Sequence, residues 1–139
     1  MIVEYQRPKD MDEALKLIGR EDLKTVPIGG GSAFDRHSQD PVAVVDLQAL
    51  ELNAFQDQGN FLGIGATLTL QAFLDNLTGE EASNFDGLRR ALLNETSYNL
   101  RQVGTAAGTL ISADGRSPFT TVMLALDAVI TFEPGTKQV

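Results

Sequence analysis

Two glycine-rich segments about seventy positions apart are the residues of this chain best suited to bind a ligand. The first follows a strand-like run and reads Val26-Pro27-Ile28-Gly29-Gly30-Gly31-Ser32-Ala33-Phe34. Three consecutive glycines permit positive φ angles, and the successive backbone amides of such a turn can form a nest for anionic oxygens. The segment is therefore a candidate anion-binding loop. An ordinary tight turn is the alternative, because glycine clusters are common in turns.

The second segment, Leu100 to Leu110, also follows a strand-like run and carries small residues at 105–109. Together the two segments suggest a clamp that closes on one diphosphate ligand, so we expect them to meet in space. A buried strand of small residues packed against a helix is the alternative for 105–109. Arg101, just before this segment, could pair with a phosphate or hold a neighbouring carboxylate such as Glu95, with a surface salt bridge as its alternative.

Two common nucleotide-binding motifs are absent from the first loop. No Gly-Lys-Ser/Thr follows the glycines, so the loop is not a Walker A motif. Phe34 stands where the dinucleotide fingerprint needs its third glycine, and the chain does not alternate strand and helix regularly. A Rossmann-like NAD-binding domain is thereby disfavoured.

Composition excludes several functional classes. The 139 residues allow one compact domain or two small lobes, and 42% hydrophobic residues suffice for a core. A net charge of -8 argues against nucleic-acid binding, which depends on Lys and Arg. With no Cys, disulfides, iron–sulfur ligation and thiol catalysis are excluded within this chain, and a single His, His37, disfavours a histidine-rich metal site. No apolar run approaches the ~18 residues of a membrane span, and no secretory leader is indicated, so we expect a cytoplasmic α/β domain.

The elements that position the first loop are predicted to form a β-α-β lobe. Residues 2–5 indicate a strand. Asp10 is a candidate N-cap with Glu13 three residues later, so a helix should begin there and end at Gly19. Residues 24–28 then form the strand that delivers the glycine loop, and residues 42–47 form another. The predicted N-terminal lobe covers residues 1–52.

A second lobe, residues 53–139, is predicted to begin with a hairpin whose turn lies at 57–60. Thr69 should cap one helix, apolar spacing from Phe85 indicates another, and Ser117-Pro118 should start a third. Glu80-Glu81 fall in a polar stretch and are interpreted as a solvated loop. Residue 129 opens a last hairpin whose return strand has barely begun at Val139. We therefore expect this lobe to be truncated, either by trimming or in a naturally short family member.

An ordered set of short phrases resembles the FAD-binding domain of molybdenum-hydroxylase flavoproteins, the medium subunits of carbon monoxide dehydrogenases and the middle segment of xanthine dehydrogenases. The phrases are Tyr5-x-Arg7-Pro8, Ile28-Gly29-Gly30-Gly31-Ser32, Val44-Val45-Asp46-Leu47, Ile64-Gly65-Ala66-Thr67-Leu68-Thr69, Leu100-Arg101-x-Val103-x-Thr105 and Leu124-Ala125-Leu126-Asp127-Ala128. The resemblance covers nearly the whole chain and implies two lobes of the FAD-binding type-2 (PCMH-like) fold. It implies that residues 27–34 wrap the FAD diphosphate and that 105–109 make a second contact. The implied cofactor-binding residues are Pro27, Ile28, Gly29, Gly30, Gly31, Ser32, Ala33, Phe34, Thr105, Ala106, Ala107, Gly108, Thr109 and Asp114; no catalytic residue and no metal ligand is implied.

The sequence departs from the family pattern in the second segment. The family usually has Thr-x-Gly-Gly-Asn there, and this chain has Ala107 and Thr109 in place of the first glycine and the asparagine. The aspartate expected about nine residues later falls on Pro118. Asp114 is a candidate substitute, although Asp114-Gly115 is also an ordinary turn sequence.

The resemblance implies the flavoprotein part of a dehydrogenase, an oxidoreductase in which FAD passes electrons from partner redox centres to an external acceptor. The partners would be molybdenum-cofactor and iron–sulfur subunits or domains, and self-association stays open. The alternative is a degenerate relative that binds FAD weakly or not at all and serves as an assembly module.

Overall fold

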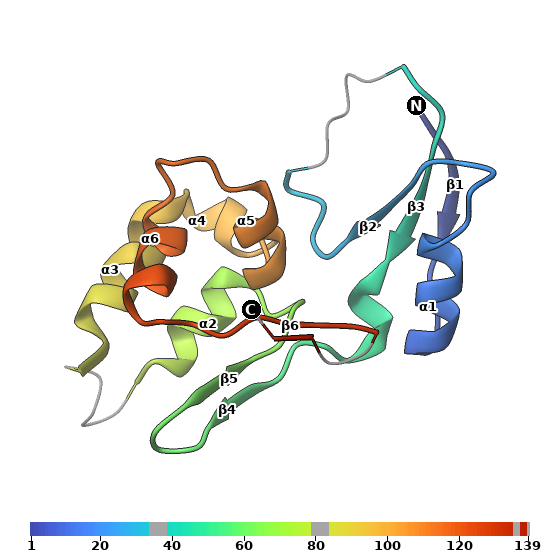
Figure 1. The fold of residues 1–139 in the computed structure, drawn as a ribbon. Helices are drawn as coiled ribbons and strands as arrows, with labels where there is room; N and C mark the ends of the chain where they lie inside the picture. Colours follow the sequence, from blue (N-terminus) through green and yellow to red (C-terminus); the bar gives the residue numbers. More distant parts are fainter. Residues whose placement is uncertain (34–38, 79–83, 135–136, 139) are drawn as a thin grey trace.

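The structure, a computed structural model, describes residues 1–33, 39–78, 84–134 and 137–138. It has a mixed α/β fold, which confirms the predicted class (Figure 1). The strands are β1 (Ile2–Gln6), β2 (Thr25–Ile28), β3 (Val42–Asp46), β4 (Phe55–Asp57), β5 (Leu62–Ile64), β6 (Thr131–Phe132) and β7 (Lys137–Gln138). The helices are α1 (Met11–Ile18), the short 3-10 helix η1 (Leu47–Leu50), α2 (Leu70–Asn76), α3 (Asp86–Glu95), α4 (Tyr98–Arg101), α5 (Ala106–Ser112) and α6 (Pro118–Ala125).

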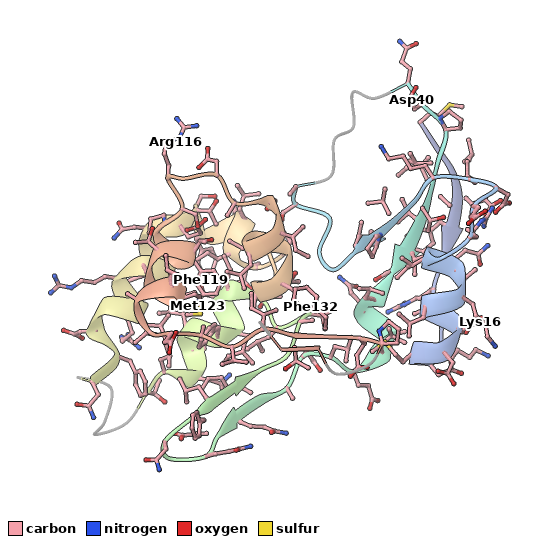
Figure 2. All side chains as sticks on the ribbon, in the orientation of Figure 1. Lys16, Asp40, Arg116, Phe119, Met123 and Phe132 are labelled. Carbon is pink, nitrogen blue, oxygen red and sulfur yellow. The ribbon has the colours of Figure 1, made fainter. Side chains whose placement is uncertain are left out.

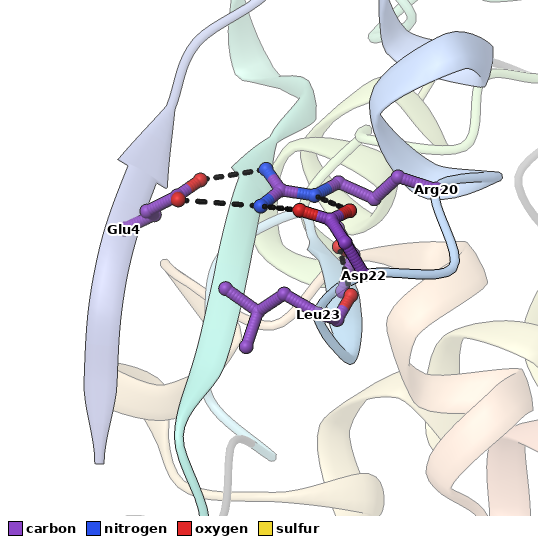
Figure 3. Close-up of polar contacts among 5 residues, drawn as sticks. Glu4, Arg20, Asp22 and Leu23 are labelled. Carbon is purple, nitrogen blue, oxygen red and sulfur yellow. Dashed lines mark hydrogen bonds and ion pairs between the residues drawn. The ribbon is translucent and has the colours of Figure 1, made fainter.

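The N-terminal part is a parallel sheet of strand order β1-β3-β2 with α1 packed against β2 and β3. All of β3 is buried, as expected for the central strand. Ile28 at the end of β2 pairs with Asp46 at the end of β3, so the glycine loop leaves the carboxyl edge of the sheet. Arg20, which follows α1, connects this segment to the sheet by donating hydrogen bonds to Glu4 on β1 and to Asp22 (Figure 3).

The remainder of the described chain is mainly helical and lies beside the sheet, with the β4-β5 hairpin beneath it (Figure 1). Its core is built where α2, α3 and α6 meet and includes Phe73, Leu92 and Phe119. The rings of Phe73 and Phe119 pack edge to face, with centroids 6.1 Å apart. Phe119 and Met123, labelled in Figure 2, belong to the side of α6 that faces this core.

The predicted helix starts are confirmed. The Asp10 side chain accepts from the Glu13 amide, and Thr69 and Ser117 cap α2 and α6 in the same way. The final hairpin is confirmed as the antiparallel pair β6-β7. The division into lobes at residues 52 and 53 stays a prediction.

Two local predictions around the second glycine-rich segment are wrong. The run before it forms the helix α4, where we predicted a strand, and residues 105–109 form a capped helix start, where a buried strand was the alternative. The reason is tertiary: residues 104–107 pair with 66–70 through the Leu70 amide on the Gly104 carbonyl and the Ala106 amide on the Leu68 carbonyl. This pairing fixes the chain just where α5 begins.

Candidate functional site

The first glycine loop exposes backbone amides at the carboxyl edge of the sheet. Gly31 has a φ of +70°, the left-handed region that glycine tolerates best. The amides of Gly30, Gly31 and Ser32 donate to no acceptor among the residues that the structure describes. Of the other residues implied for this loop, Pro27 and Ile28 lie in β2, Ala33 is exposed, and Phe34 lies outside the described residues. The loop thus has the open donors that an anion requires.

The second segment has one open backbone donor among the described residues, the Thr105 amide, and its other amides are engaged. Thr105 caps α5 by accepting from the Gly108 amide, and the Thr109 amide donates to the Thr105 carbonyl. The amides of Ala106 and Ala107 donate to the Leu68 and Ala66 carbonyls. Residues 105–109 therefore form no second amide nest, and their contact with a ligand stays a prediction that rests on side chains. The Thr109 hydroxyl is one such group, because it makes no hydrogen bond within the described part of the chain.

The two segments meet, which confirms the expected juxtaposition. A methyl group built on Gly29 would lie 2.7 Å from the Thr105 Oγ1, and one built on Gly30 would overlap the Val103 carbonyl oxygen. One built on Gly104 would lie 3.6 Å from the Ser32 Oγ. The absence of side chains at 29 and 30 is therefore needed for the two segments to pack.

A hollow of about 360 Å³ lies further along α5 and is bounded by the end of α3 and the start of α6. It brings together Thr109, Asp114 and Pro118, three positions that the sequence singled out. Its lining is Asn94, Glu95, Thr109, Ser112, Ala113, Asp114, Arg116, Ser117 and Pro118. The hollow is thus open and polar, at the far end of the helix that begins against the glycine loop.

Asp114 at the rim of this hollow is engaged by a neighbour. Its Oδ1 accepts from the Arg116 amide at 2.9 Å, and its Oδ2 pairs with the Arg116 guanidinium at 2.8 Å. These hydrogen bonds from Arg116 hold the pKa of Asp114 below its usual value. Arg116 itself extends outward from the loop before α6 (Figure 2). Asp114 is therefore an ionised, partnered rim residue, and its role toward a cofactor stays a prediction.

Arg101 neither pairs with Glu95 nor forms a surface salt bridge among the described residues, and its pairing with a phosphate stays a prediction. It is buried, and its guanidinium donates to the carbonyls of Leu93 and Thr96, at 3.2 and 2.8 Å, and to the Gln71 Oε1 at 3.1 Å. Glu95 instead accepts from the Ser117 hydroxyl and from the Phe119 amide, and so anchors the start of α6. Arg101 therefore ties α2, α3 and α4 together.

Some positions were missed from the sequence, and some cannot be placed. The contact between Val103 and the first loop was not predicted, because no pattern in the neighbouring sequence indicates it. Asp46 is buried and accepts from the Tyr5 hydroxyl, which, with burial, raises the pKa of Tyr5. The sequence signal that could have identified Asp46 is its place as a polar residue at the end of an apolar strand. His37 and Glu80-Glu81 lie outside the described residues.

Within the described ranges, no helix is long and apolar enough to cross a membrane. The same residues contain no group of His, Asp and Glu side chains that could hold a metal ion.

Known proteins resemble this chain in sequence and in fold. Residues 1–139 match the family described as the FAD binding domain in molybdopterin dehydrogenase. The Escherichia coli K12 protein YgfM, described as uncharacterized, is 31% identical over 137 residues, which are 97% of this chain and 51% of YgfM. The chain thus spans about half the length of the curated relatives it matches.

Two solved structures share the fold. Reconstituted CO dehydrogenase from Oligotropha carboxidovorans contains a chain 25% identical to this one, with a TM-score of 0.82 over 98% of this chain and 49% of that one. Quinoline 2-oxidoreductase from Pseudomonas putida 86 gives a TM-score of 0.77 at 24% identity, over 98% of this chain and 49% of that one. Because the family match extends over the whole sequence and the fold agrees with it, this chain belongs to the FAD-binding domain family of molybdopterin dehydrogenases, a family whose cofactor is FAD.

Proposed function

We propose that this chain holds FAD by its diphosphate on loop 29–32 and serves as the flavin-binding part of an oxidoreductase. The observation that carries the proposal is the set of open amides at Gly30, Gly31 and Ser32. These donors point from a loop without bulky side chains, so phosphate oxygens can approach the backbone closely. The overall charge of -8 does not oppose this, because the donors are dipoles of the backbone and need no basic side chain.

The residues around the loop fit an elongated dinucleotide. Thr105, at the start of α5, lies against Gly29, and Thr109 and Ser112 line the hollow further along the same helix. Seven residues of helix separate Thr105 from Ser112, a rise of about 10 Å. Loop 29–32 would hold the diphosphate, and the free Thr109 hydroxyl would bind a polar atom of the same molecule beyond it.

Bound FAD would supply the redox chemistry, and the chain would supply binding, orientation and electrostatics. No side chain on either segment has to act as an acid, a base or a nucleophile. We further propose that electrons arrive from molybdenum-cofactor and iron–sulfur partners and leave to an external acceptor, in a cytoplasmic complex. The lack of Cys supports separate partners, because iron–sulfur clusters are held by cysteine thiolates.

A second candidate is an assembly module that has kept the fold and lost most of its affinity for FAD. It is favoured by the second segment, where the amides of residues 106–109 bond to protein acceptors, and by Pro118 at the first position of α6, where the family pattern predicted an aspartate. Both features reduce the contacts available beyond the diphosphate. We therefore expect the 139-residue chain alone to bind FAD weakly, mainly through its ADP half.

Absorption spectroscopy and calorimetry on the purified chain test these alternatives. If the diphosphate contacts dominate, ADP and FAD bind with similar, modest affinity and little flavin absorption survives purification. Tight FAD binding with much weaker ADP binding would show that Asp114, Thr109 or another group holds the flavin half, and the expected weakness would be wrong. Binding of neither molecule would refute the cofactor proposal and leave the assembly module.

A further inference from the structure

Loop 29–32 lies on a short backbone platform made of Val103, Gly104 and Thr105, here called the seat. Gly29 faces the Thr105 side chain, Gly30 faces the Val103 carbonyl, and Ser32 faces Gly104. The seat and the loop come from parts of the fold with separate hydrogen-bonding networks, the helical part and the parallel sheet (Figure 1). The position of the loop is thus set by residues about seventy positions away.

The seat itself has little freedom to yield. The Gly104 amide donates to the Leu100 carbonyl at 2.7 Å, and the Gly104 carbonyl accepts from the Leu70 amide at 2.9 Å. Thr105 is buried and spends its hydroxyl on the Gly108 amide, so its side chain cannot turn away without uncapping α5. A side chain added at Gly29 or Gly30 would therefore displace the loop and leave the seat in place.

The third glycine has a different requirement. Gly31 carries the left-handed φ of +70°, and a methyl group built on it would meet only the Ile28 side chain, at 3.9 Å. Gly31 is thus constrained by its own backbone angle, whereas Gly29 is constrained by the Thr105 side chain. The same Gly→Ala change at the two sites probes two physical causes.

We infer that the seat is the positioning element of the diphosphate loop, and that the Thr105 side chain acts on the ligand by holding Gly29 in place. The inference rests on the proposed function, because it explains how the open amides are held in one arrangement. The position of the loop then depends on how the sheet packs against the helical part, and that packing depends on the position of the loop. Ligand binding at the loop should then stabilise that packing, since coupling between two events is reciprocal.

A double-mutant cycle tests this directly, with ADP as the probe and calorimetry as the readout. Gly29→Ala should weaken ADP binding about tenfold or more, because the methyl group pushes the loop off the seat. Thr105→Ala removes the Oγ1 and Cγ2 atoms, which lie 2.7 and 2.9 Å from the new methyl group, and leaves the Cβ at 3.3 Å. In the Thr105→Ala background, the same Gly29→Ala change should therefore cost at most about twofold. A general loss of folding could not produce this rescue.

Two other glycines serve as controls. Gly87→Ala, on α3 with nothing within 4 Å of the new methyl group, should leave ADP affinity unchanged. Gly31→Ala should weaken binding by a similar factor with and without Thr105→Ala, because strain at a positive φ is not relieved at position 105. If Gly29→Ala costs the same factor in both Thr105 backgrounds, the seat does not position the loop and the inference is overturned.

The melting temperatures of the ligand-free proteins separate failure of this inference from failure of the proposed function. If the wild-type chain binds neither ADP nor FAD, the proposed function is wrong. The temperature losses of the cycle then decide about the seat. If the double variant loses less melting temperature than the two single variants added together, the Gly29–Thr105 contact is supported. If the two losses add, the contact is contradicted.

Discussion

Arg101→Met should destabilise the fold without acting on a ligand. The guanidinium of Arg101 donates to the carbonyls of Leu93 and Thr96, which belong to the end of α3 and the turn after it. Carbonyls in the last turn of a helix have no partner within the helix, so an outside donor must satisfy them. Methionine keeps the apolar stem of the side chain and removes every donor.

The expected loss follows from those two carbonyls. A buried acceptor left without a partner costs about 1 to 3 kcal/mol, so two give at most about 6 kcal/mol. Leu93 is 47% exposed and Thr96 is half-buried, so water can replace part of the lost bonding and we expect the lower end of this range, about 2 to 3 kcal/mol. The third partner, Gln71, is only half-buried and can turn toward water, so it adds little. For a domain of this size such a loss lowers the melting temperature by roughly 10 °C. The stability of Arg101→Lys should lie between those of wild type and Arg101→Met, because a single ammonium cannot donate to both carbonyls as the forked guanidinium does.

Urea unfolding followed by circular dichroism measures the change. The matched control is Arg90→Met, on the exposed side of α3, which should stay within about 0.5 kcal/mol of wild type. If Arg101→Met also stays within that range, the carbonyls do not need the guanidinium and the argument fails. Loss of ADP binding at unchanged stability would instead make Arg101 the phosphate ligand that the sequence allowed.

Three further predictions concern other parts of the fold. Asp127 has a φ of 54°, so Asp127→Ala should lower the free energy of unfolding by about 1 kcal/mol relative to Asp127→Gly in urea titrations. Phe119→Ala should cost about 3 to 5 kcal/mol, because the ring is buried in the core; a melting temperature near that of wild type would contradict this. Arg20 lowers the pKa of Glu4 and of Asp22, so their stabilisation is fully present above the ordinary values of 4.5 and 3.8 and is lost as pH falls through the lowered ones. Arg20→Gln should flatten this acid dependence in unfolding measured between neutral and acidic pH, and an unchanged slope would argue against the pair.

Helix starts were predictable because their determinants are local. The Asp10 side chain reaches an amide three residues ahead, and Thr69 and Ser117 do the same. Each pattern lies within four positions of sequence, so no tertiary information was needed. The same holds for the β4-β5 turn, where the Asp57 side chain accepts from the Gly59 amide.

The segment before the second loop was mispredicted because its structure is decided at a distance. Val103 and its neighbours have the apolar pattern of a strand, yet α4 forms and Arg101 is drawn inward by acceptors on α2 and after α3. Residues 104–107 then pair with a segment that lies more than thirty positions earlier. Such pairing overrides local propensity and leaves no mark in a short window of sequence.

The three glycines of the first loop meet structural requirements that the sequence alone did not separate. From sequence alone the glycines were assigned to positive φ angles and to close approach of backbone and phosphate. In the structure, Gly31 is required by its left-handed φ angle, whereas Gly29 and Gly30 are required because any side chain there would clash with the seat. A side chain at Gly30 would strike the Val103 carbonyl before any ligand arrived, so loss of cofactor in such a variant cannot by itself identify a phosphate contact. A displaced loop and a lost phosphate contact can be separated only by pairing Gly29→Ala with a change on the seat. Thr105→Ala relieves the clash and restores the loop position, but it cannot restore a missing contact between backbone and ligand.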